Sequence, residues 1–372
     1  MSETSLGFKR LTRITWSEYF MGIAFLSAKR CEDQDMNGAC IVNNDNIIVG
    51  IGYNTLPEGC ENMKSKKGIA CHAEVNAIKN TDLRNVKGCT MYVTSFPCNN
   101  CANVIIQSGI KKIIYLDDNS GHKAIAAKHM FESTGVTYVP YNTNCYKKPI
   151  DHTKKKQINS EEYFMGIAYL SSRRSKEAMF DIGACIVNKD GVVVGTGYNG
   201  MPRGMDEIPK LKTGQSSQCT SKLSGFFKVC HAVINAVLNR NTNNIKDSTL
   251  YVTTYPCIEC AKIILQFGIT RLVHMPIKQN IDTQVAKELL ETAAISIRKY
   301  NLSKEMEIYE EASQTSETTK DIATATNQAS TANNQVVKIE HLMMNQAMRE
   351  QLMKMIQSQG VITESNILKL SK

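Results

Sequence analysis

The sequence predicts two tandem α/β domains, each with a sheet between helices, followed by a tail of different composition. Three observations support this fold class. The chain has 372 residues, which is long enough for two ordinary domains with separate cores. A long segment is repeated further along the chain, and within each copy apolar β runs alternate with helical segments. Such alternation is typical of layered α/β domains.

The repeat defines the two copies. The segment at 17–30, "SEYFMGIAFLSAKR", returns at 161–174 as "EEYFMGIAYLSSRR", and "GACIVN" returns 145 positions further on. By contrast, Cys71 of the first "CHA" matches Cys230, 159 positions further on. An insertion of about 14 residues therefore lies between Gly204 and Cys230, in a stretch rich in Lys and Ser that indicates a surface loop.

Each copy has the same order of predicted elements. Apolar residues at helical spacing predict the first helix, and apolar or alternating runs rich in β-branched residues predict the strands. His and Cys motifs each open a further helix. In the first copy these elements are a helix at 17–30, β runs at 38–43 and 46–54, a helix opened at 72, a β run at 89–96, a helix at 98–110 and a β run at 111–116.

Composition places the domain boundaries. We expect a first domain at 1–145, a Lys-rich linker at 146–159 and a second domain at 160–300. The tail at 301–372 is rich in Ser, Thr, Asn and Gln, which predicts disorder over its first part. Near the end of the tail, apolar residues at helical spacing predict a short amphipathic helix: Met344, Met348, Leu352 and Met355. This helix would either bind a partner or pack on its own domain.

Bulk composition narrows the class of protein. A hydrophobic content of 42% and no apolar run of about 18 residues argue against a membrane protein. With no secretory signal at the N-terminus, we expect a cytoplasmic protein, and the linker lysines leave a nuclear address open. Thirteen cysteines, an odd count, indicate thiols or metal ligands rather than disulfides. The net charge of +9 favours an anionic partner, either nucleotide or nucleic acid.

Four residues of the first copy predict a zinc centre with a proton shuttle. His72 precedes Glu74 by two positions, and Cys98 and Cys101 follow in "PCNNC". One imidazole and two thiolates make three ligands and leave a fourth position open, as in catalytic rather than structural zinc sites. Cys71 adjoins His72 and is interpreted as a buried small residue, not a fourth ligand. HxE followed by PCxxC is the signature of zinc-dependent nucleobase deaminases.

The second copy keeps the ligands and loses the carboxylate. His231, Cys257 and Cys260 repeat the ligand set, so we expect a second Zn²⁺ there, but Val233 stands where Glu74 is expected. In the first copy Glu74 would act as general base and then general acid, with zinc lowering the pKa of water. Val233 can do neither, so the sequence predicts one active site and one disabled copy.

These motifs resemble the deoxycytidylate (dCMP) deaminase family of the cytidine deaminase-like fold, over about 15–142 and 160–300. The resemblance rests on "SEYFMGIAFLSAKR", "GACIVN", "GYNTLPEG", "CHAEVNAI" and "FPCNNCANVIIQSGI". It implies a mixed five-stranded sheet between helices in each copy and hydrolytic removal of the 4-amino group from a deoxycytidine nucleotide. It also implies Asn54 as a contact to sugar or base, although a purely structural role in the turn is an equal alternative.

The resemblance further implies partners and regulation. Family members form homo-oligomers that respond to dCTP and dTTP, so the second copy would be a regulatory or structural module. The substrate would be dCMP or, as an alternative, dCTP. A competing hypothesis is a nucleic-acid editing deaminase, since such enzymes also pair an active subunit with one that carries Val in place of Glu. A third hypothesis, that the chain is a non-enzymatic scaffold protein, has little support because Glu74 and the ligands beside it are all present.

Overall fold

The structure is a computed structural model of the chain. Contacts divide the chain into two units, and every described residue belongs to the unit at 9–310. The described residues are 13–31, 36–57, 59–60, 69–81, 86–119, 121–142, 157–175, 181–201, 229–276 and 281–300. The predicted insertion, most of the linker and the tail at 301–372 lie outside them.

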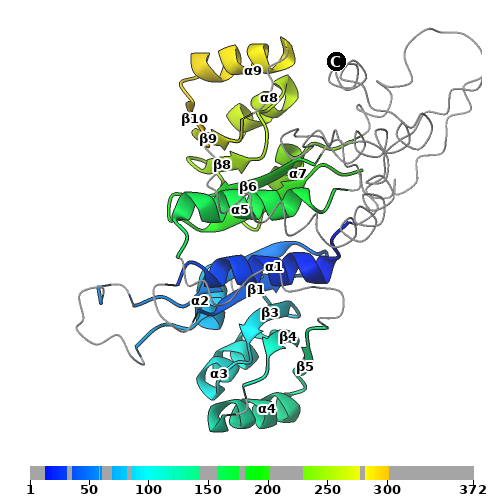
Figure 1. The fold of residues 1–372 in the computed structure, drawn as a ribbon, viewed down its shortest axis with the longest axis vertical. Helices are drawn as coiled ribbons and strands as arrows, with labels where there is room; N and C mark the ends of the chain where they lie inside the picture. The colour runs from blue at the N-terminus through cyan, green and yellow to red at the C-terminus, as the bar shows by residue number, and fades with distance from the viewer. Residues whose placement is uncertain are drawn as a thin grey trace, which may run out of the picture. The chain divides into compact units, whose positions relative to one another are not determined.

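The first copy is built on one mixed sheet. Its strands are β1 (Gly38–Val42), β2 (Ile48–Tyr53), β3 (Thr90–Ser95), β4 (Lys112–Asp117) and β5 (Thr137–Pro140). The strand order is β2-β1-β3-β4-β5, with β1 antiparallel to β2 and β3, and with β3, β4 and β5 parallel (Figure 1). The helices of this copy are α1 (Trp16–Ala28), α2 (Ala73–Lys79), α3 (Asn99–Ser108) and α4 (His122–Thr134).

The second copy repeats this topology. Its strands are β6 (Gly183–Val187), β7 (Val193–Tyr198), β8 (Thr249–Val252), β9 (Arg271–His274) and β10 (Ser296–Lys299). They form a sheet in the order β10-β9-β8-β6-β7, in which each pair has the same direction as its counterpart in the first copy. The helices are α5 (Ser160–Ser172), α7 (Ala232–Leu238), α8 (Ile258–Gln266) and α9 (Ile281–Thr292).

Each copy has its own apolar core on one face of its sheet. In the first copy, side chains of α2, α3 and α4 pack against side chains of β1, β3 and β4. The large buried residues of this core include Ile41 and Met91 from the strands and Ile105 and Phe131 from the helices. The second copy packs α7, α8 and α9 on its sheet in the same way. These cores fix the helices that begin at the His and Cys motifs, so they set the position of the site.

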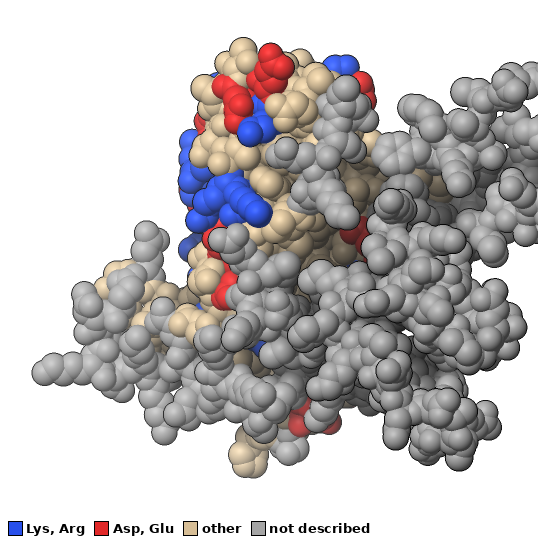
Figure 2. Space-filling model, turned by 45° about the horizontal axis from the view of Figure 1, so that its top comes forward, with Lys and Arg blue, Asp and Glu red and all other residues tan. Residues whose placement is uncertain are grey.

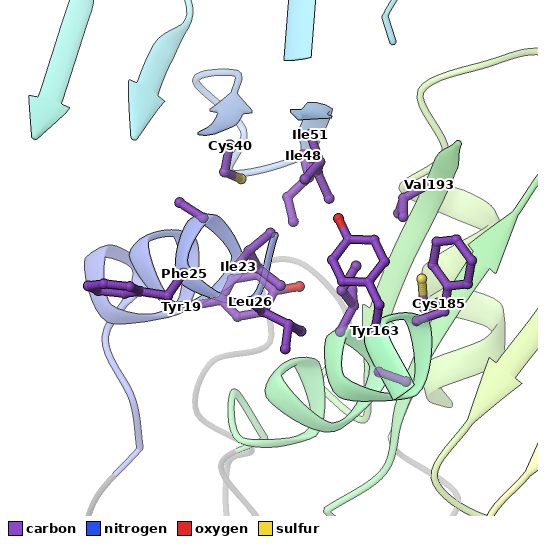
Figure 3. Packing of buried hydrophobic residues seen from close by; sticks show 14 of the residues in the cluster. Tyr19, Ile23, Phe25, Leu26, Cys40, Ile48, Ile51, Tyr163, Cys185 and Val193 are labelled. Carbon is purple, nitrogen blue, oxygen red and sulfur yellow. The ribbon is translucent and has the colours of Figure 1, made fainter. Parts of the chain in front are cut away.

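A third core is shared by both copies and lies around α1 and α5. It joins side chains of both helices to the faces of β1, β2, β6 and β7 (Figure 3). Helix α1 is buried over every residue from Tyr19 to Ala28. Over these residues α1 has no side exposed to water, because α5 covers the face that a single domain would leave in solvent.

Two hydrogen bonds across this shared core are related by the repeat. The Tyr19 hydroxyl lies 2.8 Å from Ser171 Oγ, and the Tyr163 hydroxyl lies 3.0 Å from Ser27 Oγ. Tyr19 matches Tyr163 in the repeat, and Ser27 matches Ser171. Each copy therefore offers the same surface to the other, as the subunits of a two-fold symmetric dimer do.

The α/β class, the repeated architecture and the five-stranded sheets are confirmed. Reasoning from residue patterns did not find α4 and β5, and only the resemblance implied a fifth strand. The buried face of α4 consists of Ala124, Ala127 and Phe131, so its apolar periodicity is weak. Strand β5 is an edge strand with mostly exposed side chains. Among the described residues, none of the helices combines the length and apolar character needed to span a bilayer.

Candidate active site and metal centres

The predicted ligands of the first copy meet where two helices begin. His72 is the N-cap residue of α2, Cys98 is the N-cap residue of α3, and Cys101 lies in the first turn of α3. The His72 side chain makes no capping bond to α2 and lies instead beside the sulfur atoms of Cys98 and Cys101. The first turn of a helix favours negative charge, which helps to hold cysteine as thiolate.

The donor atoms are spaced as a tetrahedral ion requires. His72 Nδ1 lies 3.2 Å from Cys101 Sγ and 3.6 Å from Cys98 Sγ, and all three donor atoms fall within 4.8 Å of one another. With Zn–S bonds of about 2.3 Å and Zn–N bonds of about 2.1 Å, tetrahedral geometry separates nitrogen from sulfur by about 3.6 Å. The residues therefore fit the zinc ion that the motif predicts.

The two thiols of this group behave as a coupled pair. The pKa of the Cys98 thiol is lowered to about 3, because Cys101 donates a hydrogen bond to its thiolate and His72 lies beside it. The pKa of Cys101 is raised, because its proton is held by Cys98. The pair thus shares one proton, and a bound cation that replaced this proton would hold both sulfurs as thiolates.

Glu74 lies in the first turn of α2, beside this group. Its side chain is only 6% exposed. Its carboxyl group is in hydrogen-bonding reach of the Cys101 sulfur and of its own backbone N–H. Burial raises the pKa of this carboxyl above the ordinary value, although the nearby His72 opposes the shift. A buried carboxyl whose pKa is raised holds a proton more readily than an exposed one, which suits a group that takes up a proton and then returns it.

Helix α2 is held tightly against strand β2. A Cβ atom on Gly52 would lie 2.2 Å from Ala77 N and 2.3 Å from Ala73 O. Only glycine therefore lets the strand approach the helix so closely. Asn76 Nδ2 in α2 donates to the backbone oxygen of Tyr53 at 2.8 Å. Any displacement of β2 would therefore displace α2 and with it the side chains of His72 and Glu74.

Asn54 is also part of this support. Its Oδ1 accepts a hydrogen bond of 2.8 Å from Ala73 N, the first backbone donor of α2. This bond satisfies an N–H group that His72, as N-cap, does not. The side chain is buried, and the matching Asn199 bonds to Ala232 N in the same way. The structural role is thus present in both copies, and a contact of Asn54 to the substrate stays a prediction.

The second copy reproduces the ligand group. His231 Nδ1 lies 3.2 Å from Cys257 Sγ and 3.4 Å from Cys260 Sγ. The pKa of Cys257 is lowered to about 4 by a hydrogen bond from Cys260 and by His231, and that of Cys260 is raised. Val233 is 2% exposed and belongs to the apolar core of this copy. The ligand set is therefore complete, and the proton-carrying side chain is absent.

Two details differ from the expectations or were missed. Cys71 stands outside the ligand group, as expected, but it is half-buried rather than buried, and its backbone pairs with Thr55. Asn76 and its counterpart Asn235, which tie each helix to its strand, were not predicted. Their repetition in "VNAI" and "INAV" was the available signal.

Comparison with known proteins identifies the class. Residues 14–117 and 158–275, which make up more than half of the chain, match the family described as "Cytidine and deoxycytidylate deaminase zinc-binding region". The chain therefore belongs to this family of zinc-dependent deaminases, and the tandem arrangement reflects two family domains.

Two curated relatives agree with this assignment. The chain is 46% identical to the deoxycytidylate deaminases of Pongo abelii and Homo sapiens over 166 residues, which covers 41% of this chain and 93% of each relative. A solved structure of dCMP deaminase from the cyanophage S-TIM5 is 24% identical, covers 34% of this chain and 96% of that chain, and has a TM-score of 0.30.

Proposed function

We propose that the first copy removes the 4-amino group of a deoxycytidine nucleotide by hydrolysis, with dCMP as the substrate and dUMP and ammonia as the products. The observation that carries this proposal is the buried carboxyl of Glu74 beside His72, Cys98 and Cys101. The relatives at 46% identity, which are named deoxycytidylate deaminases, support dCMP as the nucleotide.

The chemistry of the proposal depends on proton transfer by Glu74. A zinc ion held by His72, Cys98 and Cys101 would supply Lewis acidity that makes water a better nucleophile. The Glu74 carboxylate takes a proton from the water that attacks C4 of the cytosine ring. It returns this proton to ring nitrogen N3, and it then carries the proton of the new C4 hydroxyl to the amino nitrogen, so that the C4–N bond breaks, ammonia leaves and C4 becomes a carbonyl. Asn54, next to the start of α2, is proposed to contact the sugar or base as well as to hold the helix.

In this proposal the second copy does not turn over substrate. Val233 has no proton to give, so His231, Cys257 and Cys260 would hold zinc in a structural or regulatory domain. The regulatory form of the proposal has dCTP or dTTP as effectors and a homo-oligomer as the working assembly. The alternative proposal is that the first copy deaminates dCTP instead of dCMP. With either substrate, the protein would act in cytoplasmic nucleotide metabolism.

The described surface carries charges of both signs. Figure 2 shows Lys and Arg side chains beside Asp and Glu side chains on one face of the molecule. In the second copy, Lys262 pairs with Glu259 at 2.9 Å and Arg298 pairs with Glu161. A surface that binds nucleic acid usually carries Lys and Arg clustered on one face or along a helix, and these two pairs each place an acidic side chain against a basic one. The net charge of +9 is therefore a weak argument for editing.

The test is a substrate panel. Purified full-length protein is incubated with dCMP, dCTP, deoxycytidine and tRNA, and both ammonia release and base identity are followed. We expect turnover of dCMP. Glu74→Gln should keep its zinc and its unfolding temperature but lose about 100- to 10,000-fold in kcat, as when a general acid and base is removed. Parental activity in this variant contradicts the catalytic assignment, and activity on tRNA alone favours editing.

A further inference from the structure

We propose that the second copy positions the active site of the first, through the aromatic contact between Tyr163 and Tyr53 in the shared core. The inference rests on the proposed function, since it concerns the site at Glu74. It assigns the second copy a role that requires no ligand and no turnover of its own.

The contact lies at the end of the strand that supports α2. The rings of Tyr163, from α5, and Tyr53, the last residue of β2, meet edge to face with centroids 6.2 Å apart and planes at 73°. Tyr163 is buried, and Figure 3 shows its ring extending from α5 toward Ile48 and Ile51 of β2. Edge-to-face pairs of this kind add to the energy of burial and favour one ring orientation.

A second contact on the same tyrosine comes from Arg30 of the first copy, which is itself held by the segment that leads into α5. The Arg30 guanidinium lies over the Tyr53 ring, 5.7 Å from its centroid. Arg30 Nη1 donates to the backbone oxygen of Ile158 at 2.6 Å, and Ile158 N donates to Lys29 O at 3.1 Å. Ile158 lies two residues before α5, at the end of the linker and inside the second family match at 158–275. The second copy therefore holds Tyr53 directly through Tyr163 and indirectly through Arg30.

From Tyr53 the path to the site is short. The backbone oxygen of Tyr53 accepts from Asn76 Nδ2 in α2, and the next residue, Asn54, accepts from Ala73 N at the start of the same helix. His72 and Glu74 flank Ala73. A shift of Tyr53 would therefore move both the ligand and the proton shuttle, and misplacement by about 1 Å can cost about 100-fold in rate. Tyr163 is thus a positioning residue, not a catalytic one.

The repeat supplies a matched control. Tyr19 is the counterpart of Tyr163: it is buried to a similar degree and bonds to Ser171 as Tyr163 bonds to Ser27. Tyr19 faces the second copy, where it also bonds to Thr196 of β7. Loss of either ring should cost the shared core about the same stability. Only loss of Tyr163 should loosen the strand that supports Glu74.

The experiment compares Tyr163→Leu, Tyr163→Phe and Tyr19→Leu in the full-length protein, with kcat, KM, zinc content and unfolding temperature measured for each. We expect the two Leu variants to lose similar unfolding temperature and to keep their zinc. Tyr163→Leu should lower kcat by about 10- to 100-fold with little change in KM. Tyr19→Leu should keep the parental kcat, and Tyr163→Phe, which retains the ring, should restore it.

Equal effects on kcat in the two Leu variants, or none in either, overturn the inference. If a Leu variant does not fold, Arg30→Lys and its repeat counterpart Arg174→Lys make the same comparison with a milder change, and only Arg30→Lys should lower kcat. A parent protein that deaminates no substrate of the panel contradicts the proposed function instead. If the parent protein is active and the two matched variants have equal kcat values, only the positioning role is contradicted.

Discussion

Glu74 and Val233 occupy equivalent positions near the starts of α2 and α7 and are almost equally buried, at 6% and 2% exposure. The carboxyl group bears a desolvation cost, which appears as its raised pKa, and the isopropyl group bears none. Metal ligation and proton transfer are therefore separable in this fold. A ligand set that persists without its carboxylate is expected to act as a structural tie between the starts of α7 and α8.

The two ligand groups predict the zinc content of the protein. Two complete ligand groups should bind close to two zinc ions per chain. Cys257→Ser combined with Cys260→Ser should remove one ion and lower the unfolding temperature, because the tie between the two helices is lost. The measurement is elemental analysis of dialysed protein, with Cys230→Ser as control, since Cys230 lies outside the ligand group. A parent value near one ion per chain would show that the second site does not hold zinc.

Among the elements, the pair formed by β2 and α2 places the active site. Strand β2 and helix α2 are joined by the close approach at Gly52, by the bond that Asn54 accepts from Ala73 N and by the bond that Asn76 donates to Tyr53 O. The same contacts recur between β7 and α7, where a Cβ atom on Gly197 would lie 2.2 Å from Ala236 N. The two copies therefore carry the same steric constraint, but only one carries the proton shuttle.

This symmetry makes a matched pair of variants informative. Gly52→Ala and Gly197→Ala each force a methyl group into helix backbone, so we expect each to destabilise the protein by about 1–3 kcal/mol, as overpacking does. Only Gly52→Ala displaces Glu74, so only that variant should lose most of its kcat. Chemical denaturation and steady-state kinetics on both variants test this. An equal loss of kcat in both would mean that global stability, not local placement, limits turnover.

The sequence was most informative where the determinants are local. His72 and Glu74 are two positions apart, and Cys98 and Cys101 are three apart, so their motif and helix starts could be predicted without tertiary structure. The contacts between α1 and α5 join residues far apart in the sequence: Ser27 and Tyr163 are 136 positions apart, and Tyr19 and Ser171 are 152 positions apart. The repeat shows that both helices exist and are apolar, but it does not specify that each covers the other.

The whole described unit resembles a symmetric dimer within one chain. The shared core contains repeat-related pairs, and the surface that α1 offers to α5 is nearly the surface that α5 offers to α1. Leu26 illustrates the fit: a Cβ atom on Gly166 of α5 would lie 2.9 Å from its Cδ2. The counterpart of Gly166 in the first copy is Gly22, which is also glycine. The first copy thus carries both halves of a self-complementary surface.

We therefore predict that the first copy expressed alone, residues 1–145, forms a homodimer. Without α5, the buried face of α1 would be exposed to water, and a second copy of α1 is the surface that fits it. Tyr19 should then bond to Ser27 of the partner subunit, in place of Ser171. Light scattering after gel filtration should give twice the fragment mass at micromolar concentration. Leu26→Glu, which places a charge in the contact, should shift the fragment toward monomer or aggregate, whereas Ala126→Glu at an exposed position of α4 should not. A stable, folded monomer of the unmodified fragment would show that α1 does not need a partner, and the view of the chain as an internal dimer would be wrong.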